Sequence, residues 1–323
     1  MIISRTSFRV SFAGGGSDLP AFYREEPGGV ISTAIARYMY VTVHPSFDCG
    51  VRVSYSKTEM VSHCDELAHP MVREALRAAG IRSGIEITSV ADVPAGTGLG
   101  SSSSFAVGLL NALWCYLRQP REAEELAREA CELEMVRLAE PIGKQDQYIA
   151  AYGGLKHIEF FPDGNVRVNP VACENGRKAE LEEKLLLFYV GGSHDAGSIL
   201  REQSKDTASK RPVLRRMRDI AGEMKQVLAS GENLRIFGEL LHEGWTLKRT
   251  LNGGISNSKI DDIYAAARGA GALGGKLLGA GGAGFVLLFC ERENQARLRG
   301  ALDGMRELPF AFETEGSRII YSK

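Results

Sequence analysis

The segment Asp92–Ser104 most constrains the fold of this chain, because it places three alternating glycines and four consecutive serines between two apolar segments. The preceding run, Gly84–Val90, is rich in β-branched residues and predicts a strand. The following run, Phe105–Leu117, predicts a buried helix. Glycines let a backbone approach a ligand closely, and the first turn of a helix presents unpaired N–H groups and a partial positive charge. The segment therefore predicts an anion site, most often for phosphate, rather than a loop that only caps a helix.

Two common nucleotide motifs are absent. Gly274-Gly275-Lys276 is the nearest approach to a Walker A loop, but Ala270 stands at its first glycine position and Leu277 at its Ser/Thr position. The triple glycine Gly14–Gly16 follows a predicted strand, yet Pro20 comes too soon for a dinucleotide-binding helix. Another arrangement must therefore neutralise the phosphates.

Length and composition limit the remaining classes of protein to which this chain can belong. The chain has 323 residues, which favours two domains, and a net charge of -1, which argues against nucleic acid or a membrane surface as partner. No uninterrupted apolar segment is long enough to span a bilayer. The six cysteines lack the close spacing of zinc or redox motifs, so we expect a reduced, cytoplasmic protein. His63, Cys64 and His69 are the one hint of a metal cluster, and without recognised ligand spacing we interpret them as ordinary loop residues.

Hydrophobic periodicity predicts an α+β chain. The predicted strands are 2–12, 29–36, 38–45, 51–55, 85–90, 155–161, 166–171, 185–190 and 285–290, with two more near 310–313 and 318–321. The predicted helices are 70–79, 105–117, 121–139, 198–210, 212–230, 234–251, 259–269 and 291–305. The polar, charged stretch 172–184 marks a domain boundary.

Three separated glycine-rich loops, at Gly14, Gly96 and Gly279, require one explanation. Pro94–Ser102 matches the pattern Pro-x-x-x-Gly-Leu-Gly-Ser-Ser, and Gly279–Gly284 is a late glycine-rich loop that leads into a strand. In this the chain resembles the superfamily of galactokinase, homoserine kinase, mevalonate kinase and phosphomevalonate kinase, the GHMP kinases, over essentially its whole length. The resemblance implies an α+β, two-domain GHMP kinase fold. Residues 1–180 would form a ribosomal-protein-S5-like ATP-binding domain and residues 181–323 a ferredoxin-like α/β-plait domain, with the active site between them.

Within that superfamily the segments 13–18, 96–104 and 143–148 resemble the D-glycero-D-manno-heptose 7-phosphate kinases. The resemblance implies transfer of the γ-phosphate of ATP to the anomeric O1 of the sugar phosphate, with Mg²⁺, giving the 1,7-bisphosphate for nucleotide-activated heptose in lipopolysaccharide, capsule or other surface glycans. Two alternatives stay open: a 1-kinase for an unphosphorylated sugar of the galactose or fucose type, and a catalytically silent GHMP-like binding protein. The implied partners are small molecules only, with the chain a monomer or homodimer.

The resemblance also implies residue roles. Asp146 corresponds to the catalytic aspartate, and Arg9 would be a fixed positive charge beside it. Mg²⁺ requires hard oxygen ligands, for which Ser102 and Glu134 are the candidates, with Glu132 as the second choice for the carboxylate. The ATP phosphates would be held by Pro94, Gly96, Thr97, Gly98, Leu99, Gly100, Ser101, Ser102 and Ser103.

The predicted sugar site draws on the first and third glycine-rich loops and on the segment after the predicted strand 185–190: Gly15, Gly16, Ser17, Asp18, His194, Gly281 and Gly282. Asp18 has the spacing from Arg9 seen in galactokinase-like members and would accept hydrogen bonds from sugar hydroxyls. Relatives carry an arginine where His194 stands, which leaves the identity of the sugar open. The substrate's own phosphate needs a cationic pocket. Arg37, Arg201 and Lys205 are available for it, and no motif singles one out.

Overall fold

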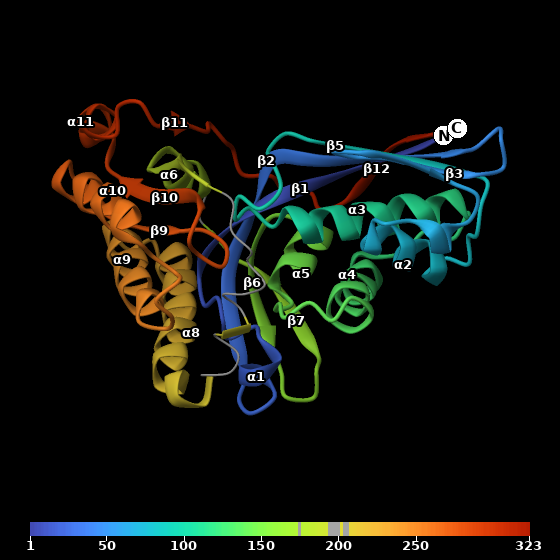
Figure 1. The fold of residues 1–323 in the computed structure, drawn as a ribbon. Coiled ribbons are helices and arrows are strands. Elements are labelled where there is room, and N and C mark those ends of the chain that lie inside the picture. The colour runs from blue at the N-terminus through green and yellow to red at the C-terminus, as the bar shows by residue number, and fades with distance from the viewer. Residues whose placement is uncertain (174–175, 193–200, 203–206) are drawn as a thin grey trace.

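The computed structural model describes residues 1–173, 176–192, 201–202 and 207–323. Strands in these ranges form an eight-stranded sheet and a four-stranded sheet, which lie on opposite sides of the molecule in Figure 1. The strands are β1 Ile2–Ala13, β2 Gly28–Pro45, β3 Val51–Ser54, β4 Thr58–Val61, β5 Ile85–Ala91, β6 Leu155–Phe160, β7 Val166–Pro170, β8 Leu185–Gly191, β9 Ala272–Leu277, β10 Gly284–Cys290, β11 Arg306–Glu307 and β12 Arg318–Ser322.

Helices flank both sheets. The α-helices are α1 Pro20–Tyr23, α2 Pro70–Ala78, α3 Ser101–Tyr116, α4 Ala123–Cys131, α5 Gln145–Tyr152, α6 Arg177–Glu183, α8 Thr207–Ser230, α9 Arg235–Arg249, α10 Ser258–Gly269 and α11 Gln295–Ala301. Shorter turns of other types are η1 Cys64–Glu66, η2 Glu132–Arg137, which is a π-helix, and η3 Arg292–Asn294. Among the described helices, none is both long enough and apolar enough to cross a lipid bilayer.

The larger sheet is organised by β2, whose two halves have different partners. Its order is β12-β1-β2-β5-β3-β4, and β6 and β7 extend from the first half of β2. Residues 28–33 of β2 pair with β6, residues 39–45 pair with β5, and β1 runs antiparallel along both halves. The prediction of two separate strands, 29–36 and 38–45, was therefore wrong, because β1 holds both halves in one continuous strand.

Helix α3 lies against the face of this sheet and fills its core. It begins at Ser101, four residues before the predicted start, so the serines form its first turn. All residues from Ser103 to Leu113 are buried. A Cβ on Gly108 would lie 2.8 Å from Oγ1 of Thr6, so the missing side chain lets α3 pack closely on β1.

The smaller sheet has the antiparallel order β11-β8-β10-β9 and packs against α9. Strand β9 was not predicted, and the sequence analysis assigned no element to residues 272–277. Its glycines are needed for packing: a Cβ on Gly274 would lie 1.9 Å from the carbonyl oxygen of Gly238 in α9. Side chains from this sheet and its helices, including Trp245, Leu186 and Val286, form a second hydrophobic core.

Several element boundaries differ from the predictions. The helix predicted over 121–139 is α-helical only to Cys131 and continues as the π-helix η2. The helix predicted over 291–305 is reduced to η3 and α11. The strand near 310–313 is a single bridge between Ile35 and Phe312. Most of the helix predicted over 198–210 lies outside the described residues.

The C-terminal tail returns to the N-terminal half of the chain. Strand β12 pairs antiparallel with β1, and the Met1 amino group donates a hydrogen bond of 2.7 Å to the carbonyl oxygen of Lys323. The two termini lie together in Figure 1. The boundary near residue 180 remains a prediction, but residues 318–322 belong by sheet membership to the first half, because β12 supplies the hydrogen-bond partners of the β1 edge.

Candidate active site

A cavity of about 330 Å³ lies where the N-terminal and C-terminal halves meet. From the first half it is lined by β1, the turn at Gly15–Asp18, the serine segment at the start of α3, η2 and the start of α5. From the second half it is lined by α9, β9 and the loop at Gly279–Gly281. The three glycine-rich segments of the sequence therefore share one cavity.

Two of these glycine-rich loops pack backbone against backbone. A Cβ on Gly98 would lie 2.5 Å from the carbonyl oxygen of Leu278, and one on Gly284 would lie 2.3 Å from the carbonyl oxygen of Thr97. Gly98 also has a φ of +82°, which side-chain-bearing residues rarely adopt. Glycine is required there both by conformation and by the close approach of the second loop.

Arg9 and Asp146 form a bidentate ion pair at the floor of the cavity. Nε and Nη2 of Arg9 donate to Oδ1 and Oδ2 of Asp146 at 2.8 and 2.7 Å, and Nη1 donates to the carbonyl oxygen of Gly98. The Arg9 side chain is 5% exposed, whereas that of Asp146 is 24% exposed. Arg9 is therefore fixed within the protein, and Asp146 keeps an edge toward the cavity.

Glu134 forms an acidic corner in the same cavity. Its Oε1 accepts a hydrogen bond from Ser102 Oγ at 2.7 Å, and its Oε2 accepts from Ser103 Oγ at 2.8 Å and Gln147 Nε2 at 2.6 Å. Burial raises the pKa of Glu134 to about 7, against the three hydrogen bonds that lower it. Glu132 is exposed and does not line the cavity.

This corner fits a magnesium ion chemically. A carboxylate beside hydroxyl groups is a set of hard oxygen donors, which Mg²⁺ prefers. Besides burial, the nearby charge of Asp146 also raises the pKa of Glu134. The two residues predicted as metal ligands, Ser102 and Glu134, are brought into direct contact.

Asp18 connects the first glycine turn to the start of α5. Its Oδ1 accepts from the Gly16 amide at 2.8 Å and its Oδ2 from the Gln145 amide at 3.4 Å. Burial raises the pKa of Asp18, and the backbone hydrogen bond from Gly16 acts in the opposite direction. Asp18 lines the cavity, and so do Gly15 and Gly16 of the same predicted sugar site.

Most of the predicted site residues line this cavity: Arg9, Gly15, Gly16, Asp18, Gly96, Gly98, Gly100, Ser101, Ser102, Ser103, Glu134, Asp146 and Gly281. Others lie behind it. Leu99 is fully buried in the main core, and its carbonyl oxygen accepts from the Arg9 amide at 3.0 Å. Thr97 Oγ1 donates to the carbonyl oxygen of Pro94 at 2.9 Å, which closes the turn of the serine segment.

Ser17 and Gly282 also have structural partners instead of a place in the cavity wall. Ser17 Oγ donates to the carbonyl oxygen of Gly14 at 2.7 Å, and it accepts from the amide of Gly29 at 3.0 Å. The Gly282 amide donates to the carbonyl oxygen of Ile255 at 3.0 Å. These contacts hold the two loops in shape. His194 lies outside the described residues.

Several polar cavity residues were missed by the sequence predictions, among them Ser11, Gln145, Lys248 and Lys276. Ser11 Oγ donates to Gln145 Oε1 at 2.9 Å, which ties β1 to the start of α5. Lys248 of α9 and Lys276 of β9 contribute cationic side chains. A lysine inside the apolar run 272–278 was the available signal for Lys276, whereas Lys248 resembles any other lysine near the end of a helix.

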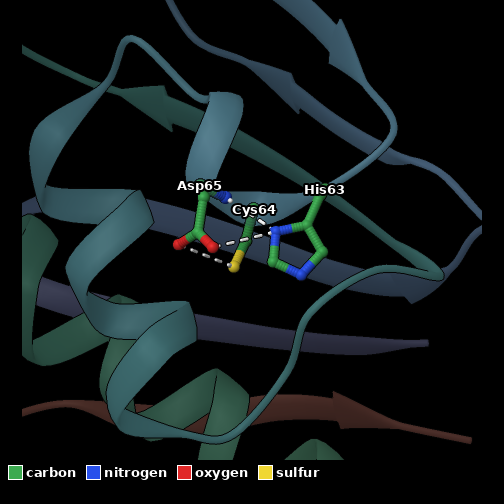
Figure 2. Close-up of side chains that lie close together, drawn as sticks. All are labelled: His63, Cys64 and Asp65. Carbon is green, nitrogen blue, oxygen red and sulfur yellow. Dashed lines mark hydrogen bonds and ion pairs between the residues drawn. The ribbon is translucent and has the colours of Figure 1, made fainter.

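His63, Cys64 and Asp65 lie close together (Figure 2), and none of them lines this cavity. His63 Nδ1 accepts from the Asp65 amide at 3.3 Å, and Arg77 Nε donates to Asp65 Oδ1 at 2.6 Å, which lowers the pKa of Asp65. Cys64 is fully buried, and His69, grouped with it in the sequence, caps α2 instead. These contacts explain the cluster as the cap and anchor of η1.

Comparisons with known proteins agree with this architecture. Residues 66–154 match the model for the N-terminal domain of GHMP kinases, and residues 172–306 match the model for the C-terminal domain. The chain is 28% identical over 318 residues to D-glycero-alpha-D-manno-heptose 7-phosphate kinase of Campylobacter jejuni, with 93% of each chain covered. It is 26% identical to L-fucokinase/L-fucose-1-P guanylyltransferase of Bacteroides fragilis, over 93% of this chain and 35% of that protein. The crystal structure of a D-glycero-D-manno-heptose 1-phosphate kinase from Bacteroides thetaiotaomicron superimposes with a TM-score of 0.82 at 26% identity, and both chains are covered completely.

Proposed function

The chain belongs to the GHMP kinase family, and on that premise we propose that it transfers the γ-phosphate of ATP to the anomeric O1 of D-glycero-D-manno-heptose 7-phosphate, giving the 1,7-bisphosphate. Members of this family are phosphotransferases, and the fold is the two-domain GHMP kinase fold. The observation that carries the proposal is the Arg9–Asp146 pair, which lies in one cavity with the Glu134–Ser102 corner. The heptose assignment rests on full-length similarity to heptose phosphate kinases. The product would enter the synthesis of nucleotide-activated heptose for surface glycans.

Asp146 is suited to the role of general base. Its carboxylate would accept the proton of the O1 hydroxyl while O1 bonds to the γ-phosphorus and the bond from that phosphorus to the bridging oxygen of ADP breaks. Arg9 would keep Asp146 oriented through two parallel hydrogen bonds and would add positive charge beside the transferring group. Because Arg9 is buried and also bonded to Gly98, this orientation needs no rearrangement during the reaction.

The serine segment is suited to hold the nucleotide phosphates. Gly96, Gly98 and Gly100 all have positive φ, which leaves a loop free of bulky side chains at the N-terminus of the 16-residue helix α3. Ser102 and Glu134 would hold Mg²⁺, which when bound neutralises phosphate charge. Asp18, Gly15 and Gly16 also line the cavity and would contact the sugar.

A kinase for an unphosphorylated sugar is the second candidate. The similarity to a fucokinase over 93% of this chain favours it. A panel that releases ADP from ATP and Mg²⁺ separates the two. It would contain heptose 7-phosphate, the corresponding free heptose, fucose and galactose, with a no-sugar control for ATP hydrolysis. Turnover that depends on the 7-phosphate supports the first proposal, and faster turnover of a free sugar contradicts it.

A further inference from the structure

Lys248 and Lys276 are two buried lysines that face the same cavity from the C-terminal half. Their exposed fractions are 8% and 7%. Alternate residues of a strand share a face, so Lys276 lies on the same face of β9 as Gly274, the face toward α9. The close approach of Gly274 to Gly238 brings α9 against β9, and Lys248 lies ten residues, or nearly three turns, beyond Gly238. The packing of α9 on β9 thus places both lysines in the cavity wall.

Few groups of the protein compensate the positive charges of these two lysines. Lys248 Nζ donates to the carbonyl oxygen of Gly279. Among the hydrogen bonds and ion pairs of the described residues, Lys276 has no side-chain partner. Burial, together with the neighbouring cations, lowers the pKa of Lys248 to about 8 and that of Lys276 well below its ordinary value. Burying like charges side by side destabilises a fold, and such a cost is typical of a binding site.

The cavity wall holds both acidic and basic side chains. Glu134 with its serines forms the acidic corner suited to Mg²⁺. The charged groups close enough to perturb both lysines are Arg9, Asp18 and Asp146, and Glu134 is not among them. Arg9 already neutralises Asp146 through two hydrogen bonds, so Asp18 alone faces two ammonium groups. When both lysines are protonated, they therefore give an excess of positive charge near Asp18 and the Arg9–Asp146 pair.

We propose that Lys248 and Lys276 bind the phosphate group that the sugar substrate already carries. This inference rests on the proposed sugar-phosphate kinase function. A phosphate monoester carries close to two negative charges at neutral pH, and its binding would favour the charged form of both lysines. Its binding would also remove the repulsion between the lysines. The pair would then select phosphorylated sugars over free ones.

Kinetics of single variants test the proposal. Lys248→Met and Lys276→Met are compared with Lys156→Met, which replaces a half-buried lysine of β6 outside the cavity wall. We expect either cavity variant to raise the KM for heptose 7-phosphate roughly 10- to 100-fold, with the KM for ATP unchanged. The preference for heptose 7-phosphate over the free heptose, measured as the ratio of the two kcat/KM values, should fall by a similar factor. An unchanged KM for the sugar phosphate, or a raised KM for ATP, would overturn the inference.

A binding measurement separates this inference from the proposed function. The nucleotide site is first filled with Mg²⁺ and the non-hydrolysable analogue AMP-PNP, and inorganic phosphate is then titrated while the Tm is followed. Phosphate should raise the Tm of the unmodified protein and of Lys156→Met, but not of Lys276→Met. Equal shifts in all three proteins would overturn the lysine site, whatever the sugar specificity. Failure of the unmodified enzyme to use any sugar phosphate would instead contradict the proposed function.

The stability of the variants gives an internal control. Replacing a buried ammonium group with methionine removes a desolvated charge next to other cations, so the Tm of Lys276→Met without ligand should equal or exceed that of the unmodified protein. A loss of substrate affinity in a protein of undiminished Tm cannot result from unfolding.

Discussion

Arg9 holds Asp146 by two parallel hydrogen bonds of 2.8 and 2.7 Å, although 137 positions separate them in the sequence. The same guanidinium donates its remaining edge to Gly98, in the loop suited to hold the nucleotide. One buried side chain thus joins β1, the start of α5 and the serine segment. The position of the proposed base is therefore coupled to the position of the phosphate loop.

Removing the carboxylate of Asp146 should abolish most of the activity. Asp146→Asn retains the shape of the side chain but cannot accept the O1 proton, so we expect kcat to fall by roughly 10²- to 10⁴-fold with ATP binding preserved. Steady-state kinetics and calorimetric titration with AMP-PNP measure the two effects. Asp163→Asn, in the exposed turn between β6 and β7, is the matched control. Turnover near the normal rate in Asp146→Asn would refute the assignment of the base.

Ser102 and Ser104 provide a matched pair on one helix turn. Ser102 Oγ reaches Glu134 in the cavity, whereas Ser104 Oγ donates to the carbonyl oxygen of Ser7, away from it. Ser102→Ala should raise the Mg²⁺ concentration needed for half-maximal activity roughly tenfold, because a hard oxygen ligand is lost. Ser104→Ala should leave this requirement unchanged. An unaltered requirement in Ser102→Ala would mean that this hydroxyl is not a ligand.

Glu134 should make stability depend on pH. Its pKa is raised from 4.5 to about 7 in the folded state, so the folded protein binds a proton more tightly than the unfolded chain between these values. The free energy of unfolding should therefore fall as pH rises from about 4.5 to about 7, by about 3 kcal/mol from this group. Denaturant unfolding of the unmodified protein and of Glu134→Gln across this range isolates the effect. Parallel curves for the two proteins would contradict it.

Magnesium should reverse that trend. The ion requires the ionised carboxylate, so the rise in Tm on adding Mg²⁺ should be larger at pH 8 than at pH 6 in the unmodified protein. Glu134→Gln should show little rise at either pH. An equal rise at both pH values would place the ion elsewhere.

Gly96 and Gly98 have similar backbone conformations but different surroundings. Their φ angles are +75° and +82°, so an alanine strains either position by about 1 kcal/mol. A Cβ on Gly96 has nothing within 4 Å, whereas one on Gly98 meets the carbonyl oxygen of Leu278 at 2.5 Å. Gly98→Ala should lower the free energy of unfolding by about 2 kcal/mol more than Gly96→Ala. Equal stability of the two variants in denaturant would refute the close packing of the two loops.

Local sequence patterns predicted much of the fold. The alternation over 2–12, the apolar run over 105–117 and the hairpin over 155–171 correspond to β1, α3 and the pair β6–β7. The secondary-structure predictions failed where tertiary packing overrode the local conformational preference of the residues. Strand β9 was not predicted, and its Gly274 is required for the close approach of α9. The strand near 318–321 was predicted, yet its pairing with β1 has no local signal.

For the candidate site, the sequence by itself determined the chemical groups that motifs contain. The order and spacing of its three glycine-rich segments identified the loops, and Asp146, Arg9, Ser102 and Glu134 were all selected before any coordinates. Motif residues can be found in this way because each loop's function depends on a few positions close together in the chain. The sequence ranks Glu134 ahead of Glu132, and in the structure Glu134 is buried in the cavity wall whereas Glu132 is exposed outside it.

Only the tertiary structure decided which groups meet. The contacts of Arg9 with Asp146 and of Ser102 with Glu134 join elements far apart in sequence. The two buried lysines lie in the cavity wall because α9 packs on β9, and no pattern of residues in the sequence predicts that packing. The physical reason is that side-chain chemistry is carried by single residues. Electrostatic environment and burial, in contrast, belong to the whole packed chain.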